Sequence, residues 1–193
     1  MRKVVMGMMT TLNGRLDDPA AWVAGVPDDL YAELDRLYAT FDTILVGRTT
    51  YDEMVEYWPG AEAAEETPES GRSMAQKMNS YKKYVFTSAQ EPAELEWNNA
   101  EAVSVDSDDD VAKFVSDLKA QSGADIHLSG GARLARTVVG LGLVDLFHLV
   151  VHPVVSPGAQ WFDQIGEQRG MELQSATTYS RGIVGLYYEP ARS

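Results

Sequence analysis

Three short runs of glycines, hydroxyl residues and one arginine have residue types and spacing that could bind a phosphate-bearing ligand. Each run follows an apolar segment: residues 47–50 (GRTT) follow TILV, residues 87–88 (TS) follow KYVF, and residues 129–131 (SGG) follow DIHL. Glycine lets the backbone approach a bound group closely, and a helix N-terminus favours an anion. The first and third runs lead into predicted helices, so we expect two helix N-termini and Arg48 to hold a diphosphate.

Each run taken alone also has a purely structural explanation, because a tight strand-to-helix turn needs small residues. Neither of the two common nucleotide fingerprints, G-x-G-x-x-G and G-x-x-x-x-G-K-[ST], occurs in the chain. The three runs are more specific together than apart. They would end parallel strands at one edge of a sheet, and ligands bind at that edge in open α/β sheets.

Composition and charge exclude several classes of partner. The chain has 193 residues and a formal net charge of -13, which disfavours nucleic acid and an anionic membrane surface. It has no cysteine, hence no disulfide and no thiolate metal site. His148 and His152 would lie on one strand roughly 13 Å apart, too far to share a metal, and we expect no metal site. No apolar segment approaches the ~20 residues of a membrane span, so we expect a cytoplasmic protein. The chain length fits one domain, over residues 1–193.

Hydrophobic periodicity predicts that strands and helices alternate through the first 140 residues and that only strands follow. We expect an acidic loop over residues 58–70. The order predicts an α/β three-layer sandwich with a mainly parallel central sheet and antiparallel C-terminal edge strands. The predicted strands cover residues 3–9, 43–47, 83–88, 101–105, 125–129, 144–155, 171–180 and 182–189, and the predicted helices cover 28–41, 49–57, 71–80, 109–121 and 132–141.

Several longer stretches resemble the dihydrofolate reductase superfamily, and above all its single-domain proteins similar to the C-terminal reductase domain of the bifunctional riboflavin-biosynthesis deaminase/reductase. These stretches are MTTLNGRL, DTILVGRTTYDEM, KYVFTS and IHLSGGARLARTVVGLGLVDLFHLVVHPVVSPGAQWF, followed by the final pair of strands. Together they cover most of the chain, in order. The resemblance implies a dihydrofolate-reductase-like fold, NADPH as the hydride donor, and a homodimer formed through the C-terminal strands.

The resemblance also implies which residues bind the cofactor. Residues 47–50 would hold the diphosphate, and residues 87–88 would lie near the adenosine ribose and its 2′-phosphate. The glycine pair and the helix start after it would close on the diphosphate and nicotinamide. The cofactor-binding residues implied in this way are Asn13, Gly14, Gly47, Arg48, Thr49, Thr50, Thr87, Ser88, Gly130, Gly131, Ala132, Arg133 and Leu134.

The stretch AWVAGVPDDLYAEL, residues 21–34, is similar to the family's helix start on the substrate side. The resemblance implies Asp29 as the catalytic acid, Trp22 at the border of the pocket, and Leu30 and Glu33 as substrate-binding residues. A carboxyl group placed there would relieve the negative charge that hydride transfer leaves on a heteroatom. Asp29 also has a simpler interpretation, as a first-turn acid that stabilises its helix.

We therefore expect an NADPH-dependent oxidoreductase that transfers a hydride to a small heteroaromatic, imine or carbonyl substrate of pterin-like or pyrimidine-like shape. One alternative is a nucleotide-binding protein of the same fold without catalysis, and another is a flavin-binding reductase. Trp161 and Phe162 would either close the core or wall the pocket. The expected partners are a small-molecule substrate and a second copy of the chain.

Overall fold

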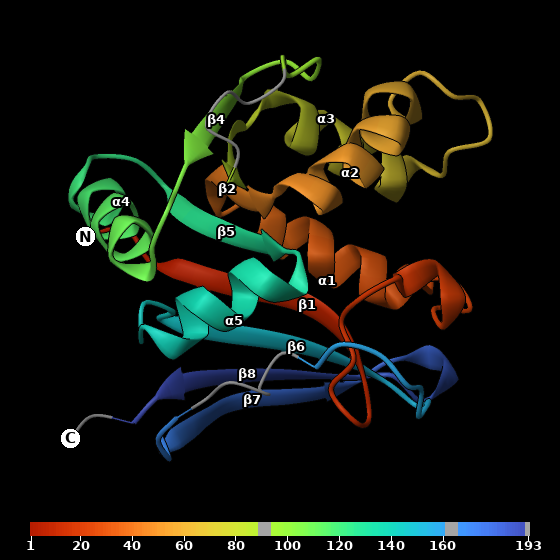
Figure 1. Cartoon of the computed structure of the whole chain (residues 1–193). Helices are drawn as coiled ribbons and strands as arrows, with labels where there is room; N and C mark the ends of the chain where they lie inside the picture. Colours follow the sequence, from red (N-terminus) through yellow and green to blue (C-terminus); the bar gives the residue numbers. More distant parts are fainter. Residues whose placement is uncertain (89–93, 161–165, 192–193) are drawn as a thin grey trace.

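A computed structural model describes residues 1–88, 94–160 and 166–191 (Figure 1), so Trp161 and Phe162 lie outside the described residues. The described residues form a central sheet with helices on both faces. The elements in chain order are β1 (Val4–Thr11), η1 (Pro19–Ala21), α1 (Asp28–Tyr38), β2 (Phe41–Gly47), α2 (Arg48–Ala61), α3 (Glu69–Ser80), β3 (Lys82–Thr87), β4 (Ala100–Ser104), α4 (Asp108–Ala120), β5 (Asp125–Gly130), α5 (Ala132–Gly140), β6 (Leu146–His152), β7 (Met171–Thr178), η2 (Ser180–Gly182) and β8 (Val184–Pro190).

The sheet has eight strands in the order β4-β3-β2-β5-β1-β6-β8-β7. Strands β1 to β6 pair in parallel, whereas β8 pairs antiparallel with both β6 and β7. This confirms the predicted parallel sheet with an antiparallel C-terminal edge. The three predicted ligand-binding runs follow or end β3, β2 and β5, which are neighbours in the sheet, so their carboxyl ends meet.

Two hydrophobic clusters, one on each face, fasten the helices to the sheet. Because successive side chains of a strand point to opposite faces, Val4, Met6 and Met8 of β1 pack with α4 and α5, while Val5 packs with α1, α2 and α3. Figure 1 shows the same division, with α4 and α5 together on one face of the sheet. The strands are covered on both sides, which is why they read as apolar runs in the sequence.

Several predicted boundaries were wrong by one or two residues, among them the start of α3, which begins at Glu69 inside the predicted loop, and three predicted ends were wrong by three or four. Helix α1 ends at Tyr38, and Phe41 begins β2, where its ring stacks on the buried His127 with centroids 5.1 Å apart. Helix α2 continues through Pro59 to the buried Ala61, into the predicted loop, because a proline in the last turn removes only one helical hydrogen bond. Strand β6 ends at His152 because Pro153, the next residue, has no N–H for the ladder.

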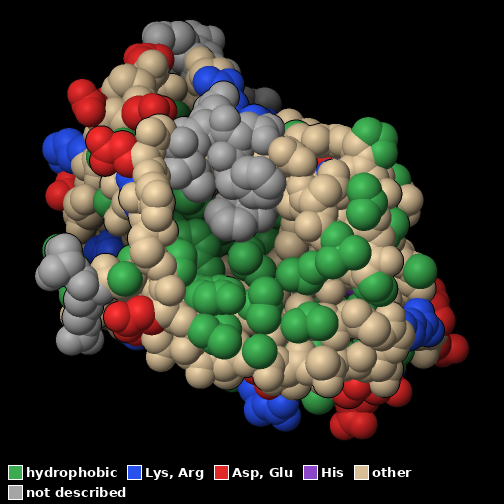
Figure 2. Space-filling view, turned by 90° about the horizontal axis from the view of Figure 1, so that it is seen from below, with side chains coloured by type: hydrophobic (Ala, Val, Ile, Leu, Met, Phe, Trp, Pro, Cys, Tyr) green, Lys and Arg blue, Asp and Glu red, His purple; other side chains and the backbone are tan. Residues whose placement is uncertain are grey.

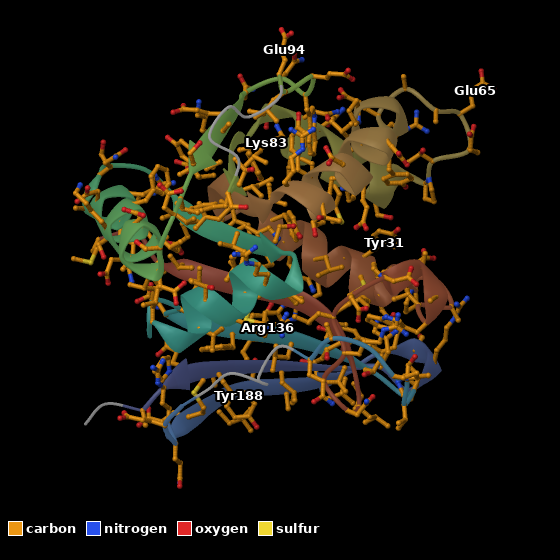
Figure 3. All side chains as sticks on the ribbon, in the orientation of Figure 1. Tyr31, Glu65, Lys83, Glu94, Arg136 and Tyr188 are labelled. Atoms are coloured by element: carbon orange, nitrogen blue, oxygen red, sulfur yellow. The ribbon has the colours of Figure 1, made fainter. Side chains whose placement is uncertain are left out.

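Lys83, labelled in Figure 3, is a fully buried cation on β3. Its ammonium donates hydrogen bonds to three backbone carbonyls, those of Asn79 (3.3 Å), Tyr81 (2.9 Å) and Asn98 (3.0 Å), and it lies 4.2 Å from the centroid of the Trp97 ring. Burial lowers the pKa of Lys83 to about 8. The carbonyls and the ring face replace the water that a buried ammonium loses, so this side chain ties α3 and β3 to the segment before β4.

The C-terminal edge of the sheet is the part least covered by other elements. All eight residues of β7 are exposed, among them Met171 at 39% and Leu173 at 53%. Figure 2 views the molecule from the side on which β7 and β8 lie, and hydrophobic side chains gather on that face. An uncovered edge strand beside apolar side chains is a surface that can pair with another chain.

Candidate functional site

The carboxyl ends of β1, β2, β3 and β5, together with the residues that follow β4, surround a cavity of about 790 Å³. All of the predicted cofactor-binding residues except Asn13 and Gly14 line this cavity. The sheet topology brings them together, since β3, β2 and β5 are adjacent and parallel. A site at this edge agrees with the general rule for ligands of parallel sheets.

The two glycine-containing junctions approach each other closely at the centre of the cavity. A Cβ atom added to Gly47 would lie 3.4 Å from the backbone nitrogen of Gly131. A Cβ atom added to Gly131 would lie 2.7 Å from Oγ1 of Thr50, so a side chain at this position requires Thr50 or the turn to shift. Gly130 has a φ of 107°, and the peptide bond between Gly130 and Gly131 is cis. Glycine is therefore favoured at Gly130 by the left-handed backbone and at Gly131 by the close approach of Thr50.

The N-termini of α2 and α5 both open toward the cavity, and each contributes an arginine in its first turn, Arg48 and Arg133. Arg48 is held by Asp52 one turn later, with Nε–Oδ2 at 3.0 Å and a second contact at 2.9 Å. The hydrogen bond to Asp52 raises the pKa of the Arg48 guanidinium above its ordinary value. Two helix N-termini and two guanidinium groups suit an anionic group at this central position.

One end of the cavity lies where β3 and β4 finish. Thr87 and Ser88 line it from β3, and residues 105–108 line it between β4 and α4. Helix α4 begins with a capping box in which Ser107 Oγ accepts from the Asp110 N–H and the Asp110 carboxylate accepts from the Ser107 N–H. Thr87, Ser88 and Ser107 contribute hydroxyl groups there, and Asp106 and Asp108 contribute carboxylates.

The other part of the lining comes from β1, from residues 16–19 and from the inner side of α2. Sequence reasoning missed these residues. Glu53 follows Thr50 by three positions and so lies one helical turn further along the same helix, a spacing that could have identified it. The residues of this part are Gly7, Met8, Met9, Leu16, Asp17, Asp18, Pro19, Glu53 and Trp58.

Asp29, the predicted catalytic acid, does not line the cavity. Its carboxylate accepts hydrogen bonds from the Ser180 backbone N–H (2.8 Å), the Ser180 hydroxyl (2.9 Å) and the Leu30 N–H (2.9 Å). These bonds, led by the one from the Ser180 backbone, lower the pKa of Asp29. The carboxylate therefore joins the start of α1 to η2, a contact between residues 151 positions apart.

The predicted substrate-binding residues also lie outside the cavity lining. Trp22 is buried against His152 with ring centroids 5.5 Å apart, and its Nε1 donates to the Asp17 carbonyl at 3.0 Å. Leu30 is fully buried in the core. Glu33 accepts from Arg36 (2.6 Å) and from the Tyr187 hydroxyl (2.9 Å), and the bond from Arg36 is the main cause that lowers the pKa of Glu33.

Asn13 and Gly14 stabilise a turn beside the cavity. Asn13 donates from Nδ2 to the Ser156 carbonyl (3.0 Å), and its Oδ1 accepts from the Ser156 N–H (3.1 Å). Gln160 donates to the Asn13 carbonyl at 2.6 Å, and Gly14 has a φ of 81°. This turn is tied to residues 154–160, and the residues that follow it, from Leu16 to Pro19, are those that reach the cavity.

The three histidines are buried in the sheet, and none of them lines the cavity. His148 stacks on Tyr187 with ring centroids 4.1 Å apart, and neither ring nitrogen has a hydrogen-bond partner among the described residues. Burial lowers the pKa of His148 to about 4. In the described part of the chain, no three histidine, aspartate or glutamate side chains are grouped so as to hold a metal ion.

No helix in the described ranges is long and apolar enough to cross a membrane.

The parallel sheet, the antiparallel edge and the cavity across the strand ends define a protein of the dihydrofolate-reductase-like α/β class, to which reductases belong. The chain matches the RibD C-terminal domain family over residues 2–185 and belongs to that family. It is 30% identical over 192 residues to the uncharacterized protein YyaP of Bacillus subtilis (strain 168). This match covers 97% of this chain and 94% of YyaP.

Two solved structures have the same fold. A pyrimidine reductase-like protein of Corynebacterium diphtheriae matches with a TM-score of 0.68 and 16% identity, covering 100% of this chain and 93% of that one. Dihydrofolate reductase of Enterococcus faecalis, solved in complex with NADP(H), matches with a TM-score of 0.64 and 12% identity, covering 98% and 97% of the two chains. At these identities the likeness establishes the fold, and the family membership supports an oxidoreductase.

Proposed function

We propose that this protein is an NADPH-dependent reductase that transfers a hydride to a small heteroaromatic, imine or carbonyl substrate. The observation that carries the proposal is the cavity itself, which runs past the ends of five adjacent strands, a span of about 19 Å at roughly 4.8 Å per strand. Such a length suits an extended dinucleotide. The Enterococcus dihydrofolate reductase, solved with NADP(H), has the same fold and supports this choice of cofactor.

In this proposal the diphosphate lies between the N-termini of α2 and α5, where Gly47 and Gly131 line the cavity. Arg48 and Arg133 neutralise its charge. Thr87 and Ser88 contact the adenosine ribose at one end, and the nicotinamide lies toward β1 beside Met8. NADPH, when bound, supplies the hydride, so this chain needs to orient the two reactants and exclude water from the reacting faces.

One observation favours the alternative of a nucleotide-binding protein without catalysis. The carboxylate predicted to act as the acid, that of Asp29, is committed to Ser180 and lies outside the cavity lining. Tight NADPH binding together with no oxidation of NADPH by any pterin, pyrimidine or imine would support that alternative. A purified protein that carries bound flavin would instead support a flavin-binding reductase.

Calorimetric titration of NADPH and of NADH into three forms of the protein tests the proposal. Gly47→Asp places a carboxylate beside the proposed diphosphate at a position whose backbone, with φ of -79°, accepts any residue. Gly60→Asp is the matched control, because it adds the same charge at the other end of α2, where an added Cβ meets nothing within 4 Å. We expect micromolar NADPH binding by the wild type and Gly60→Asp, weakened at least tenfold in Gly47→Asp. A folded wild type that binds neither nucleotide contradicts the proposal.

We also propose that the protein forms a homodimer through β7 and β8. Strand β7 is exposed along its whole length at the end of the sheet, and Met171 and Leu173 add apolar area to that edge. Light scattering should give twice the 21.2 kDa of the chain. Leu173→Lys should shift the mass to that of a monomer, and a wild type with the monomer mass would refute the dimer.

A further inference from the structure

The cavity end at which β3 and β4 finish is built from a stretch of chain without basic residues. Its lining consists of Thr87 and Ser88 with residues 105–108. Over residues 84–112 the sequence contains no lysine, arginine or histidine, and this includes residues 89–93. In the proposed function this end receives the adenosine ribose. NADPH and NADH differ only there, because the ribose carries a 2′-phosphate in the first and a 2′-hydroxyl in the second.

The cations nearest in sequence lie elsewhere. Lys82 and Lys83 begin β3, so they lie at the amino end of that strand, opposite the cavity. Lys113 of α4 is outside the cavity lining and pairs with Asp117 at 2.6 Å. Among the described residues, β3 and α4 therefore bring no cation to the ribose end of the lining.

Arg48 lines the cavity after β2, the strand next to β3, and its guanidinium is already paired. Its Nε lies 3.0 Å from one carboxylate oxygen of Asp52, and its Nη2 lies 2.9 Å from the other. The carboxylate occupies one edge of the guanidinium and offsets its charge, and in the proposed function the rest serves the diphosphate. Arg133 follows β5, two strands from β3 and so roughly 10 Å away across the sheet. The described lining thus offers a 2′-phosphate no unpaired cation at its own end.

The N-terminus of α4, which could otherwise bind a phosphate here, is filled by the chain's own carboxylate. Oδ2 of Asp110 accepts from the Asp106 N–H (3.2 Å), the Ser107 N–H (3.0 Å) and the Ser107 hydroxyl (2.8 Å). Backbone N–H groups that converge in this way at a helix start form an anion-binding position. The bond from the Ser107 hydroxyl is the main cause that lowers the pKa of Asp110, so this anion is present at neutral pH. Asp106 and Asp108 add two more carboxylates to the lining beside it.

We propose that the ribose end of the cavity selects a 2′-hydroxyl over a 2′-phosphate, so that NADH binds at least as tightly as NADPH and serves as a hydride donor. This inference rests on the proposed reductase function and refines its choice of cofactor. The carboxylates of Asp106 and Asp108 accept hydrogen bonds from the ribose hydroxyls, as an acidic side chain does in other NAD sites. A 2′-phosphate would bring about two negative charges against them, with the N–H groups before α4 already occupied.

The change of donor leaves the hydride transfer itself unaltered. The reduced nicotinamide loses a hydride, with its two electrons, and becomes NAD⁺. The C=N or C=O carbon of the substrate gains the hydride, the π pair moves to nitrogen or oxygen, and that atom takes a proton from water. The 2′-position lies far from the reacting atoms, so contacts there act on the ground state and the transition state alike and set affinity.

Calorimetry on the wild type tests the inference with NADH and NADPH and with the fragments 5′-AMP and 2′,5′-ADP. We expect NADH to bind at least as tightly as NADPH, and 5′-AMP at least as tightly as 2′,5′-ADP. Raising NaCl from about 0.02 M to about 0.3 M should raise the affinity for NADPH relative to that for NADH, because salt screens the repulsion between the 2′-phosphate and the carboxylates. A cationic clamp for the 2′-phosphate would give a salt dependence of the opposite sign and would overturn the inference.

Two charge reversals locate the effect. Asp108→Lys changes a residue of the lining, and Asp109→Lys, exposed in the same turn of α4 outside the lining, is the matched control. Asp108→Lys should raise the affinity for NADPH relative to that for NADH about fivefold in about 0.15 M salt, the effect of reversing one charge at ~7 Å from two in a dielectric of about 80. Asp109→Lys should change this ratio less than twofold.

Two further results would overturn the inference: a wild type that binds NADPH more than twofold more tightly than NADH, or equal effects of Asp108→Lys and Asp109→Lys. Both leave the reductase proposal standing. A folded wild type that binds neither dinucleotide contradicts the reductase proposal itself, so the two failures are distinguishable.

Discussion

The close approach of the two junctions gives the sharpest prediction, for Gly131→Ala. The added Cβ would lie 2.7 Å from Thr50 Oγ1, whereas ordinary contacts begin near 3.4 Å. One junction must therefore move by about 0.7 Å, and overpacking of this kind costs about 1–3 kcal/mol. For a chain of this length, about 2 kcal/mol lowers the melting temperature by roughly 4–8 °C. The displacement also separates the two helix N-termini, so NADPH affinity should fall at least tenfold.

Thermal unfolding followed by circular dichroism measures the first effect, and calorimetry measures the second. Gly140→Ala is the control, since it makes the same change in α5 where an added Cβ meets nothing within 4 Å, and it should be neutral or slightly stabilising. Thr50→Ala removes the clashing atom, so the double variant should recover at least about 1 kcal/mol of the loss. The reasoning is refuted if Gly131→Ala has the same melting temperature as the wild type, or if adding Thr50→Ala to Gly131→Ala restores no stability. In either case the two junctions do not pack as described.

Three further predictions concern buried or tethered charges. Lys83→Met removes the hydrogen-bond donor of three backbone carbonyls and should lower the free energy of unfolding by about 2–4 kcal/mol, measured by urea titration. Lys82→Met, at a partly exposed neighbour, is the control and should change the free energy of unfolding by less than about 0.5 kcal/mol. Equal losses in the two variants would contradict this prediction. Burial lowers the pKa of His148 to about 4 from 6.5, so the unfolded chain binds the proton first. The stability present above pH 6.5 is thus lost as the pH falls toward 4, by up to about 3 kcal/mol. His148→Phe should reduce this loss. If the melting temperature of His148→Phe varies with pH as that of the wild type does, His148 is not the group responsible. Asp29→Asn should lower the melting temperature more than Asp28→Asn does, because it weakens the hydrogen bonds from Ser180 in η2. It should change kcat less than twofold. A more than tenfold loss of kcat with an unchanged melting temperature would show that Asp29 is catalytic.

Much of the fold could be predicted from local sequence because each element carries its own periodicity and boundary signals. The capping box of Ser107 and Asp110 marks the start of α4, and Gly47 and Gly131 mark the starts of α2 and α5. One error fell where a long-range contact decided the outcome. Phe41 fits the apolar face of the preceding helix, yet it is used in β2 because its ring packs on His127, which is far away in the sequence.

The candidate site divides in the same way. The amino-acid sequence by itself determined the glycine-containing junctions, because a tight strand-to-helix turn restricts residue type locally and parallel strands bring such turns to one edge. Only the tertiary structure decided the substrate side. The position of Asp29 depends on Ser180, 151 residues later, and Glu53 meets Asp17 and Asp18 in one cavity only because the loop after β1 is tied to residues 154–160. Contacts of this kind depend on how distant segments pack, and no local pattern of residues encodes them.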